Sequence, residues 1–113
     1  MVYYWQGERC LANVIFTKHA KYGLLDVEYY IYTELCNPQA AKRITEGILN
    51  VVESLKEYPV RHALVKDSIL GNAGLRRVEF ENYNIFYFYN VNQNIVYIIR
   101  ILYNRADWKH ILK

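Results

Sequence analysis

The chain has 113 residues, of which 53% are hydrophobic and 22% charged, so it has the composition of one folded domain and not of a disordered protein. Its apolar runs are too short to cross a bilayer, and its first residues lack the basic start and unbroken apolar run of a secretory signal. The two cysteines, Cys10 and Cys36, form no metal-binding spacing, which favours reduced thiols over a disulfide or a metal site. We therefore expect a cytoplasmic protein with no metal, no organic cofactor and no membrane contact.

The charge is unevenly distributed along the chain. Residues 1–60 carry six Lys or Arg against seven acids, whereas residues 61–113 carry eight against four. A basic half that is also rich in aromatic residues suits a negatively charged partner, such as RNA or an acidic protein segment. The alternative is that these charges are simply solvated on the outside of a sheet.

The first half of the chain predicts a short strand and two helices. Residues 13–17, NVIFT, alternate like a β-strand. Residues 18–35 carry apolar side chains at steps of three and four, which is typical of an amphipathic helix, and Gly23 inside it should weaken the helix by about 1 kcal/mol relative to alanine. Asn37 is the expected N-cap, and Pro38 the first residue, of a second amphipathic helix over 38–58. The short link between the helices predicts an antiparallel pair.

Three strands are expected in the second half, after a loop over residues 60–74. Residues 75–81, 84–90 and 94–103 are rich in β-branched and aromatic side chains and are separated by short turns, which predicts an antiparallel meander. The last strand is apolar on both alternating sets, as expected at the centre of a sheet. The order β-α-α-β-β-β indicates an α+β domain in which two antiparallel helices pack on a twisted antiparallel sheet.

Four segments carry a resemblance to a known family: NVIFTKHAKYGLLDVEYYI, NPQAAKRITEGILNVVESLKEYP, LRRVEFENYNIFYFYN and IVYIIRILYNRADWKHIL. In this order, over residues 13–112, they resemble the RelE/ParE superfamily, the toxins of bacterial type II toxin–antitoxin (plasmid stabilisation) modules. The resemblance implies a single toxin domain over residues 13–113, with residues 1–12 as an N-terminal extension outside the family pattern.

The chain departs from that pattern at three positions. Gly23 stands where members commonly carry an acidic residue, and Tyr103 where many carry histidine. Asn84 follows Tyr83 at the position where the ribonuclease branch, as in RelE, typically carries a catalytic arginine. The last two departures weaken the case for ribonuclease activity.

The resemblance also suggests which residues would act on RNA. Cleavage needs a base, an acid and cations that stabilise the phosphorane charge. We expect Arg77, Arg105 and Tyr103 as the catalytic residues. We expect RNA or phosphate contacts from Arg61, Lys66, Arg76, Arg100 and Lys109.

Several of these residues have structural alternatives. Arg76 and Arg77 are neighbours on a strand and must point to opposite faces, so one of them is free for other roles. Arg100 lies on an apolar strand, which slightly favours a structural arginine paired with Glu79 or Glu81.

The predicted function is that of a type II toxin that inhibits translation by ribosome-dependent mRNA cleavage. The alternatives are a ParE-like inhibitor of DNA gyrase that hydrolyses nothing, and an inactive interaction module with the same fold. Whether the chain is an enzyme therefore stays open. The expected partners are a cognate antitoxin and either the ribosome with its mRNA or gyrase.

Overall fold

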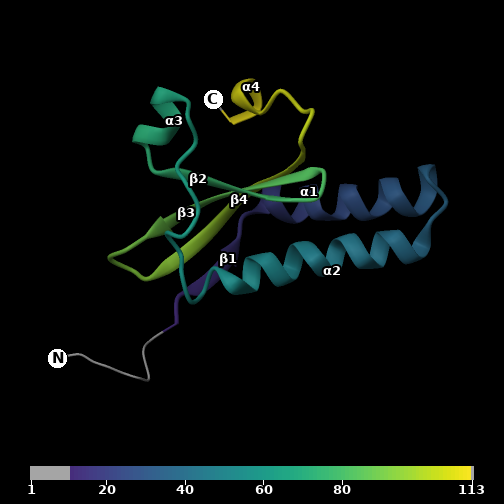
Figure 1. The fold of residues 1–113 in the computed structure, drawn as a ribbon, viewed down its shortest axis with the longest axis horizontal. Helices are drawn as coiled ribbons and strands as arrows, with labels where there is room; N and C mark the ends of the chain where they lie inside the picture. Colours follow the sequence, from purple (N-terminus) through teal and green to yellow (C-terminus); the bar gives the residue numbers. More distant parts are fainter. Residues whose placement is uncertain (1–10, 113) are drawn as a thin grey trace.

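The computed structural model describes residues 11–112, so the first ten residues of the expected N-terminal extension lie outside the described part of the chain. The elements follow one another as β1 (Asn13–Phe16), α1 (Lys18–Tyr29), the π-helical turn η1 (Tyr30–Glu34), α2 (Pro38–Ser54), α3 (Ser68–Asn72), β2 (Leu75–Phe80), β3 (Tyr83–Asn90), β4 (Ile95–Tyr103) and α4 (Trp108–Leu112) (Figure 1). The predicted order and the α+β class are confirmed. The short helices α3 and α4 were not predicted.

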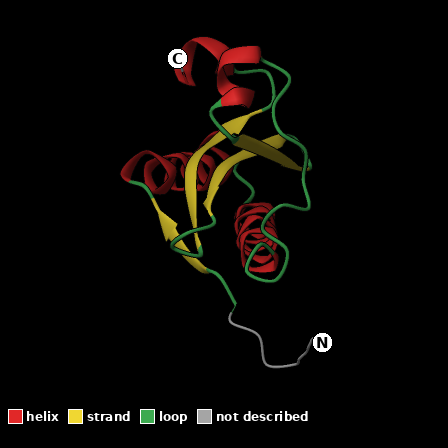
Figure 2. Cartoon of the chain, turned by 90° about the vertical axis from the view of Figure 1, so that its left-hand side faces the viewer, coloured by secondary structure: helices red, strands yellow, loops and turns green. Residues whose placement is uncertain are grey.

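The four strands form one sheet in the order β1-β4-β3-β2 (Figure 2). Strands β2, β3 and β4 make the predicted antiparallel meander. Strand β1 pairs with the other side of β4 and runs parallel to it, so the sheet is not antiparallel throughout. Because β4 lies between two strands, both of its faces can be covered, which explains its apolar residues on both alternating sets.

Both long helices begin where the sequence predicts. The Thr17 hydroxyl accepts a hydrogen bond from the Ala20 N–H at 3.2 Å, and the Asn37 side chain accepts one from the Ala40 N–H at 3.1 Å. The predicted first helix is α-helical only as far as Tyr29 and continues as η1. The second ends at Ser54, four residues before its predicted end.

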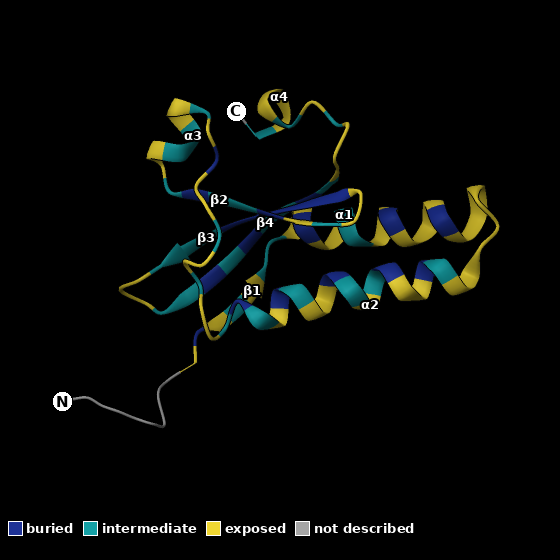
Figure 3. Ribbon diagram, in the orientation of Figure 1, coloured by how far each residue is buried: buried dark blue, intermediate teal, exposed yellow. Residues whose placement is uncertain are grey.

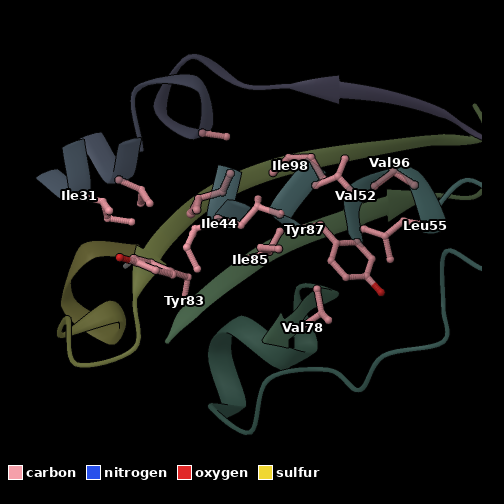
Figure 4. Packing of buried hydrophobic residues seen from close by; sticks show 14 of the residues in the cluster. Ile31, Ile44, Val52, Leu55, Val78, Tyr83, Ile85, Tyr87, Val96 and Ile98 are labelled. Carbon is pink, nitrogen blue, oxygen red and sulfur yellow. The ribbon is translucent and has the colours of Figure 1, made fainter. Parts of the chain in front are cut away.

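Helices α1 and α2 cover one face of the sheet, called here the helix face. Figure 3 shows a buried stripe along each of these helices and exposed residues on their other sides. Ile48, Leu55, Ile85, Tyr87 and Ile98 are completely buried between helices and sheet, and Figure 4 shows several of the side chains in this core.

The opposite face of the sheet, called here the outer face, is covered only in part. A smaller apolar cluster forms there around Phe86, against which Leu102 of β4 and Trp108 of α4 pack. Within residues 11–112, no helix combines the length and the apolar character that crossing a bilayer requires.

Candidate functional site

A row of three side chains crosses the outer face of the sheet. Strand pairing places Arg77 of β2 opposite Phe86 of β3, and Phe86 opposite Arg100 of β4. Residues opposite one another in neighbouring strands share a face, so the two arginines flank Phe86, with their Cα atoms about 10 Å apart.

A shift in strand register brings Arg100 to this face. Phe86 pairs with Arg100, but the next residue, Tyr87, pairs with Ile98, so Ile99 is an extra residue in β4. An extra residue reverses the side-chain alternation beyond it. Regular alternation would have grouped Arg100 with Ile98, which lies in the core of the helix face.

Trp108 of α4 links this row to a third cation. Its ring lies 5.3 Å from the ring of the fully buried Phe86, measured between centroids. The guanidinium carbon of Arg77 lies 5.8 Å from the Trp108 ring centre, and the Lys109 ammonium lies 5.6 Å from it. Both distances are within the range of cation–π attraction. We call Arg77, Arg100, Trp108 and Lys109 the basic surface.

Among residues 11–112, no carboxylate forms an ion pair with a cation of the basic surface. The ion pairs among the described residues are Arg43 with Glu81, Lys56 with Glu53, and His110 with Asp107. The suggested pairing of Arg100 with Glu79 or Glu81 is therefore not found among the described residues, because Glu81 binds Arg43 from α2 and Glu79 forms no ion pair there. Cations without a carboxylate partner next to a half-buried aromatic ring suit an anionic or acidic ligand.

Arg105 lies in the turn between β4 and α4. This turn is held by hydrogen bonds from the Asn104 N–H to the Asn82 carbonyl at 2.8 Å and from the Ala106 N–H to the Tyr103 carbonyl at 2.9 Å. The Arg105 side chain is exposed, and no carboxylate of the described residues lies within ion-pair distance of it. It is thus accessible to a ligand, like the basic surface.

Tyr103 lies on the helix face, away from Arg77. It pairs with Tyr83, and the two rings are in edge contact at 5.7 Å between centroids. Tyr103 is 45% exposed and lines a groove of about 710 Å³ between α1 and the end of β4, together with Asp26 and Arg100, so the groove reaches one cation of the basic surface. Burial, and then the neighbouring Tyr103, raise the pKa of Tyr83, so Tyr83 stays neutral near pH 7.

Asn84 is closed off from any ligand. On β3 it lies two residues before Phe86, so its side chain is on the same face of the sheet. It is opposite Glu79 of β2 and Leu102 of β4 and is only 2% exposed. Its side-chain oxygen accepts no hydrogen bond from the described residues. The residue that the resemblance aligns with the catalytic arginine of the ribonuclease branch is therefore a buried amide.

Arg76 and Arg61 fix a loop. The guanidinium of Arg76 donates a hydrogen bond to the His62 carbonyl at 2.7 Å, and that of Arg61 donates one to the Ser54 carbonyl at 3.3 Å. Arg61 also lies 5.4 Å from the ring centre of Tyr58. Because these guanidinium groups hold residues 58–62 against β2 and α2, they are less available for a phosphate than Arg77.

The structure thus divides the predicted site residues into three groups. Arg77 and Lys109 meet at Trp108, Arg100 lies across Phe86 from Arg77 and also lines the groove beside α1, and Arg105 follows the same strand. Arg61 and Arg76 hold the loop, while Lys66 is exposed just before α3. Tyr103 lies in that groove, next to Arg100 and away from Arg77. Trp108 was missed as a site residue, and its place before Lys109 in the tail was the signal that could have identified it.

We expect His62 to make folding sensitive to mildly acidic pH. Burial, and then the charge of Arg61, lower the pKa of His62 below its ordinary value of 6.5. The unfolded chain therefore binds a proton at His62 more readily than the folded one, and stability falls as pH drops below 6.5 until the folded pKa is passed.

Urea unfolding of the wild type and of His62→Gln, compared at pH 7.5 and 5.5, checks this effect. The wild type should lose more stability than the variant over this interval, because glutamine does not titrate. Equal losses in the two proteins would show that His62 has no part in the effect.

Comparisons with known proteins agree with this architecture. Residues 14–108 match the sequence model of the family described as the ParE toxin of the type II toxin–antitoxin system parDE. No curated protein matches the chain significantly.

Three solved structures have the same fold. The chromosomal ParDE system of P. aeruginosa superposes with a TM-score of 0.67 at 18% identity, over 82% of this chain and 96% of that one. The RelBE2 toxin–antitoxin complex of Mycobacterium tuberculosis gives a TM-score of 0.62 at 18% identity, over 82% and 98%. The archaeal RelE–RelB complex of Pyrococcus horikoshii OT3 gives 0.54 at 17% identity, over 85% and 99%. Since the family match covers most of the sequence, the chain belongs to the ParE toxin family of type II toxin–antitoxin systems.

Proposed function

We propose that this toxin acts by binding its target, without cleaving RNA, and that the target is DNA gyrase. The observation that carries the proposal is the separation of the expected catalytic residues. Arg77 is on the outer face of the sheet with Phe86, whereas Tyr103 is on the helix face with Tyr83. Arg77 and Tyr103 therefore do not face one phosphodiester bond together, and an RNA-cleaving site would have to use Arg100, which lines the groove beside Tyr103.

Two further features support binding without hydrolysis. The buried Asn84 leaves no cation at the position that is catalytic in the ribonuclease branch. The basic surface instead offers Arg77 and Lys109 around an aromatic ring, which is a suitable arrangement for an acidic protein surface. Ribosome-dependent mRNA cleavage, which the sequence favoured, is the alternative function that the experiment must distinguish from gyrase inhibition.

The partner that neutralises the toxin is a cognate antitoxin. The similar structures from P. aeruginosa, M. tuberculosis and P. horikoshii are those of toxin–antitoxin systems. We infer that this chain has such a partner and acts in the cytoplasm, where gyrase and the ribosome are both found.

Induction of the chain in a bacterial host tests the proposal. We expect growth arrest with intact mRNA by primer extension, and a plasmid population that loses negative supercoils. The Arg77→Ala variant should restore both growth and supercoiling.

Cleavage at the ribosomal A site that is abolished in Arg105→Ala would instead establish an mRNA interferase. Growth arrest with both intact mRNA and normal supercoiling would reject gyrase as well as the ribosome.

A further inference from the structure

Helix α4 is too short to be stable without support from the sheet. It has five residues, whereas isolated helices of fewer than about 12 residues are marginal in water. Two of its side chains, Trp108 and Leu112, pack on the apolar cluster of the outer face. The Trp108 ring lies 5.3 Å from the ring of the fully buried Phe86, measured between centroids. The position of α4 on the sheet therefore depends largely on Trp108.

The same ring is the group that holds the side chain of Arg77. Among residues 11–112, the Arg77 guanidinium forms no ion pair and donates no hydrogen bond, and its carbon lies 5.8 Å from the Trp108 ring centre. The neighbouring Arg76, by contrast, donates a hydrogen bond to the His62 carbonyl at 2.7 Å. A long side chain without such a bond populates many rotamers, and ordering it has an entropic cost. Cation–π attraction to Trp108 offsets this cost for Arg77.

Trp108 also attracts Lys109, whose ammonium lies 5.6 Å from the ring centre. Arg77 and Lys109 carry like charges and belong to different elements, β2 and α4. Like charges repel each other, so the two side chains would separate if nothing attracted both of them. The electron-rich face of the indole ring does so, and it thereby brings cations from distant parts of the sequence to one place.

We propose that Trp108 is a positioning residue, which docks α4 on the sheet and orders Arg77 and Lys109 so that both present their charges to one acidic partner. The inference rests on the proposed function, in which the basic surface binds the target. A cation that is already ordered loses less freedom on binding, which is worth roughly two- to tenfold in affinity for each side chain. Trp108 thus strengthens target binding through the two cations.

Replacing Trp108 by leucine and by phenylalanine separates the role of the ring from that of the apolar anchor. Leucine keeps an apolar contact with Phe86 but has no π-system, whereas phenylalanine keeps both. In gyrase supercoiling assays, Trp108→Leu should need about 5- to 50-fold more protein than the wild type for equal inhibition. Trp108→Phe should stay within about threefold of the wild type. Equal inhibition by the two variants, both folded by circular dichroism, would overturn the proposal.

Tyr58→Leu is the matched control for the loss of a ring. The Arg61 guanidinium lies 5.4 Å from the Tyr58 ring centre, in the loop that Arg61 and Arg76 hold. This variant removes a cation–π partner of the same kind outside the basic surface, so it should inhibit gyrase like the wild type. A loss as large as that of Trp108→Leu would show that the effect is not specific to the basic surface.

A double-mutant cycle shows whether Trp108 acts through the cations. In the Arg77→Ala background, Trp108→Leu should reduce inhibition by a clearly smaller factor than in the wild-type background, because only Lys109 is left for the ring to order. The same factor in both backgrounds would mean that Trp108 contacts the target itself, which would overturn its positioning role.

Nuclear magnetic resonance of the purified chain tests the positioning without any target. In the wild type, the Arg77 Nε–H signal should be shifted by the indole ring current and should have a high order parameter. Trp108→Phe should keep an ordered Arg77, and Trp108→Leu should not. An Arg77 side chain that is equally mobile in the wild type and in Trp108→Leu overturns the proposal, whatever the target is. An ordered Arg77 in a wild type that leaves gyrase unaffected would reject gyrase as the target and still support the positioning role.

Discussion

Replacing Gly23 by alanine is expected to lower the free energy of unfolding by about 2–3 kcal/mol, the cost of overpacking a close contact. A β-carbon at this position would lie 2.6 Å from the carbonyl oxygen of Ile101. That atom belongs to the backbone of β4 and cannot rotate away, so α1 would have to move off the sheet. Helix propensity alone predicts the opposite sign, because alanine is the better helix former by about 1 kcal/mol. Urea denaturation measures the difference.

Gly47→Ala is the matched control for this prediction. Its β-carbon would clash with the ring of Phe80, but a side chain can turn where a backbone cannot. The loss should therefore be smaller than for Gly23→Ala. A Gly23→Ala protein as stable as the wild type would mean that α1 does not approach β4 as closely as described.

Substitution of the neighbouring arginines Arg76 and Arg77 is expected to separate stability from toxicity. Arg77→Ala should weaken target inhibition about 10- to 100-fold, since a hydrogen bond to a charged group contributes about 1.5–3 kcal/mol. Its stability should change little, because the guanidinium makes a cation–π contact with the half-buried Trp108 and no ion pair with a described residue. Arg76→Ala should lose about 1–2 kcal/mol of stability, because the His62 carbonyl loses its donor at 2.7 Å.

Thermal unfolding and target inhibition measured on the same preparations decide between these roles. Arg76→Ala should inhibit like the wild type at a temperature where it is folded. If Arg76→Ala abolished inhibition while Arg77→Ala did not, the assignment of the outer face as the functional surface would be wrong.

The sequence was informative wherever structure depends on neighbouring residues. Asn37 and Pro38 start α2 as expected, and the apolar stripes place α1 and α2 on one face of the sheet. The apolar residues on both sides of β4 correctly indicated a central strand. These features follow from capping, periodicity and side-chain alternation within single segments.

Features that depend on contacts between distant segments could not be predicted. The register shift at Phe86 and Tyr87 decides where Arg100 points, and strand alternation alone gives the wrong face. The His62 carbonyl, in a separate loop, accepts a hydrogen bond from Arg76, and this leaves Arg77 as the arginine available for a ligand. Likewise, Gly23 looked like a weakness of the helix until its contact with Ile101 was known.

The most direct measurement is the supercoiling activity of purified gyrase, titrated with the wild-type chain and with the Arg77→Ala chain. Binding through the basic surface predicts that the wild type inhibits supercoiling and that Arg77→Ala needs about 10- to 100-fold more protein for the same inhibition. Unimpaired supercoiling at every wild-type concentration, or equal inhibition by both proteins, would contradict it.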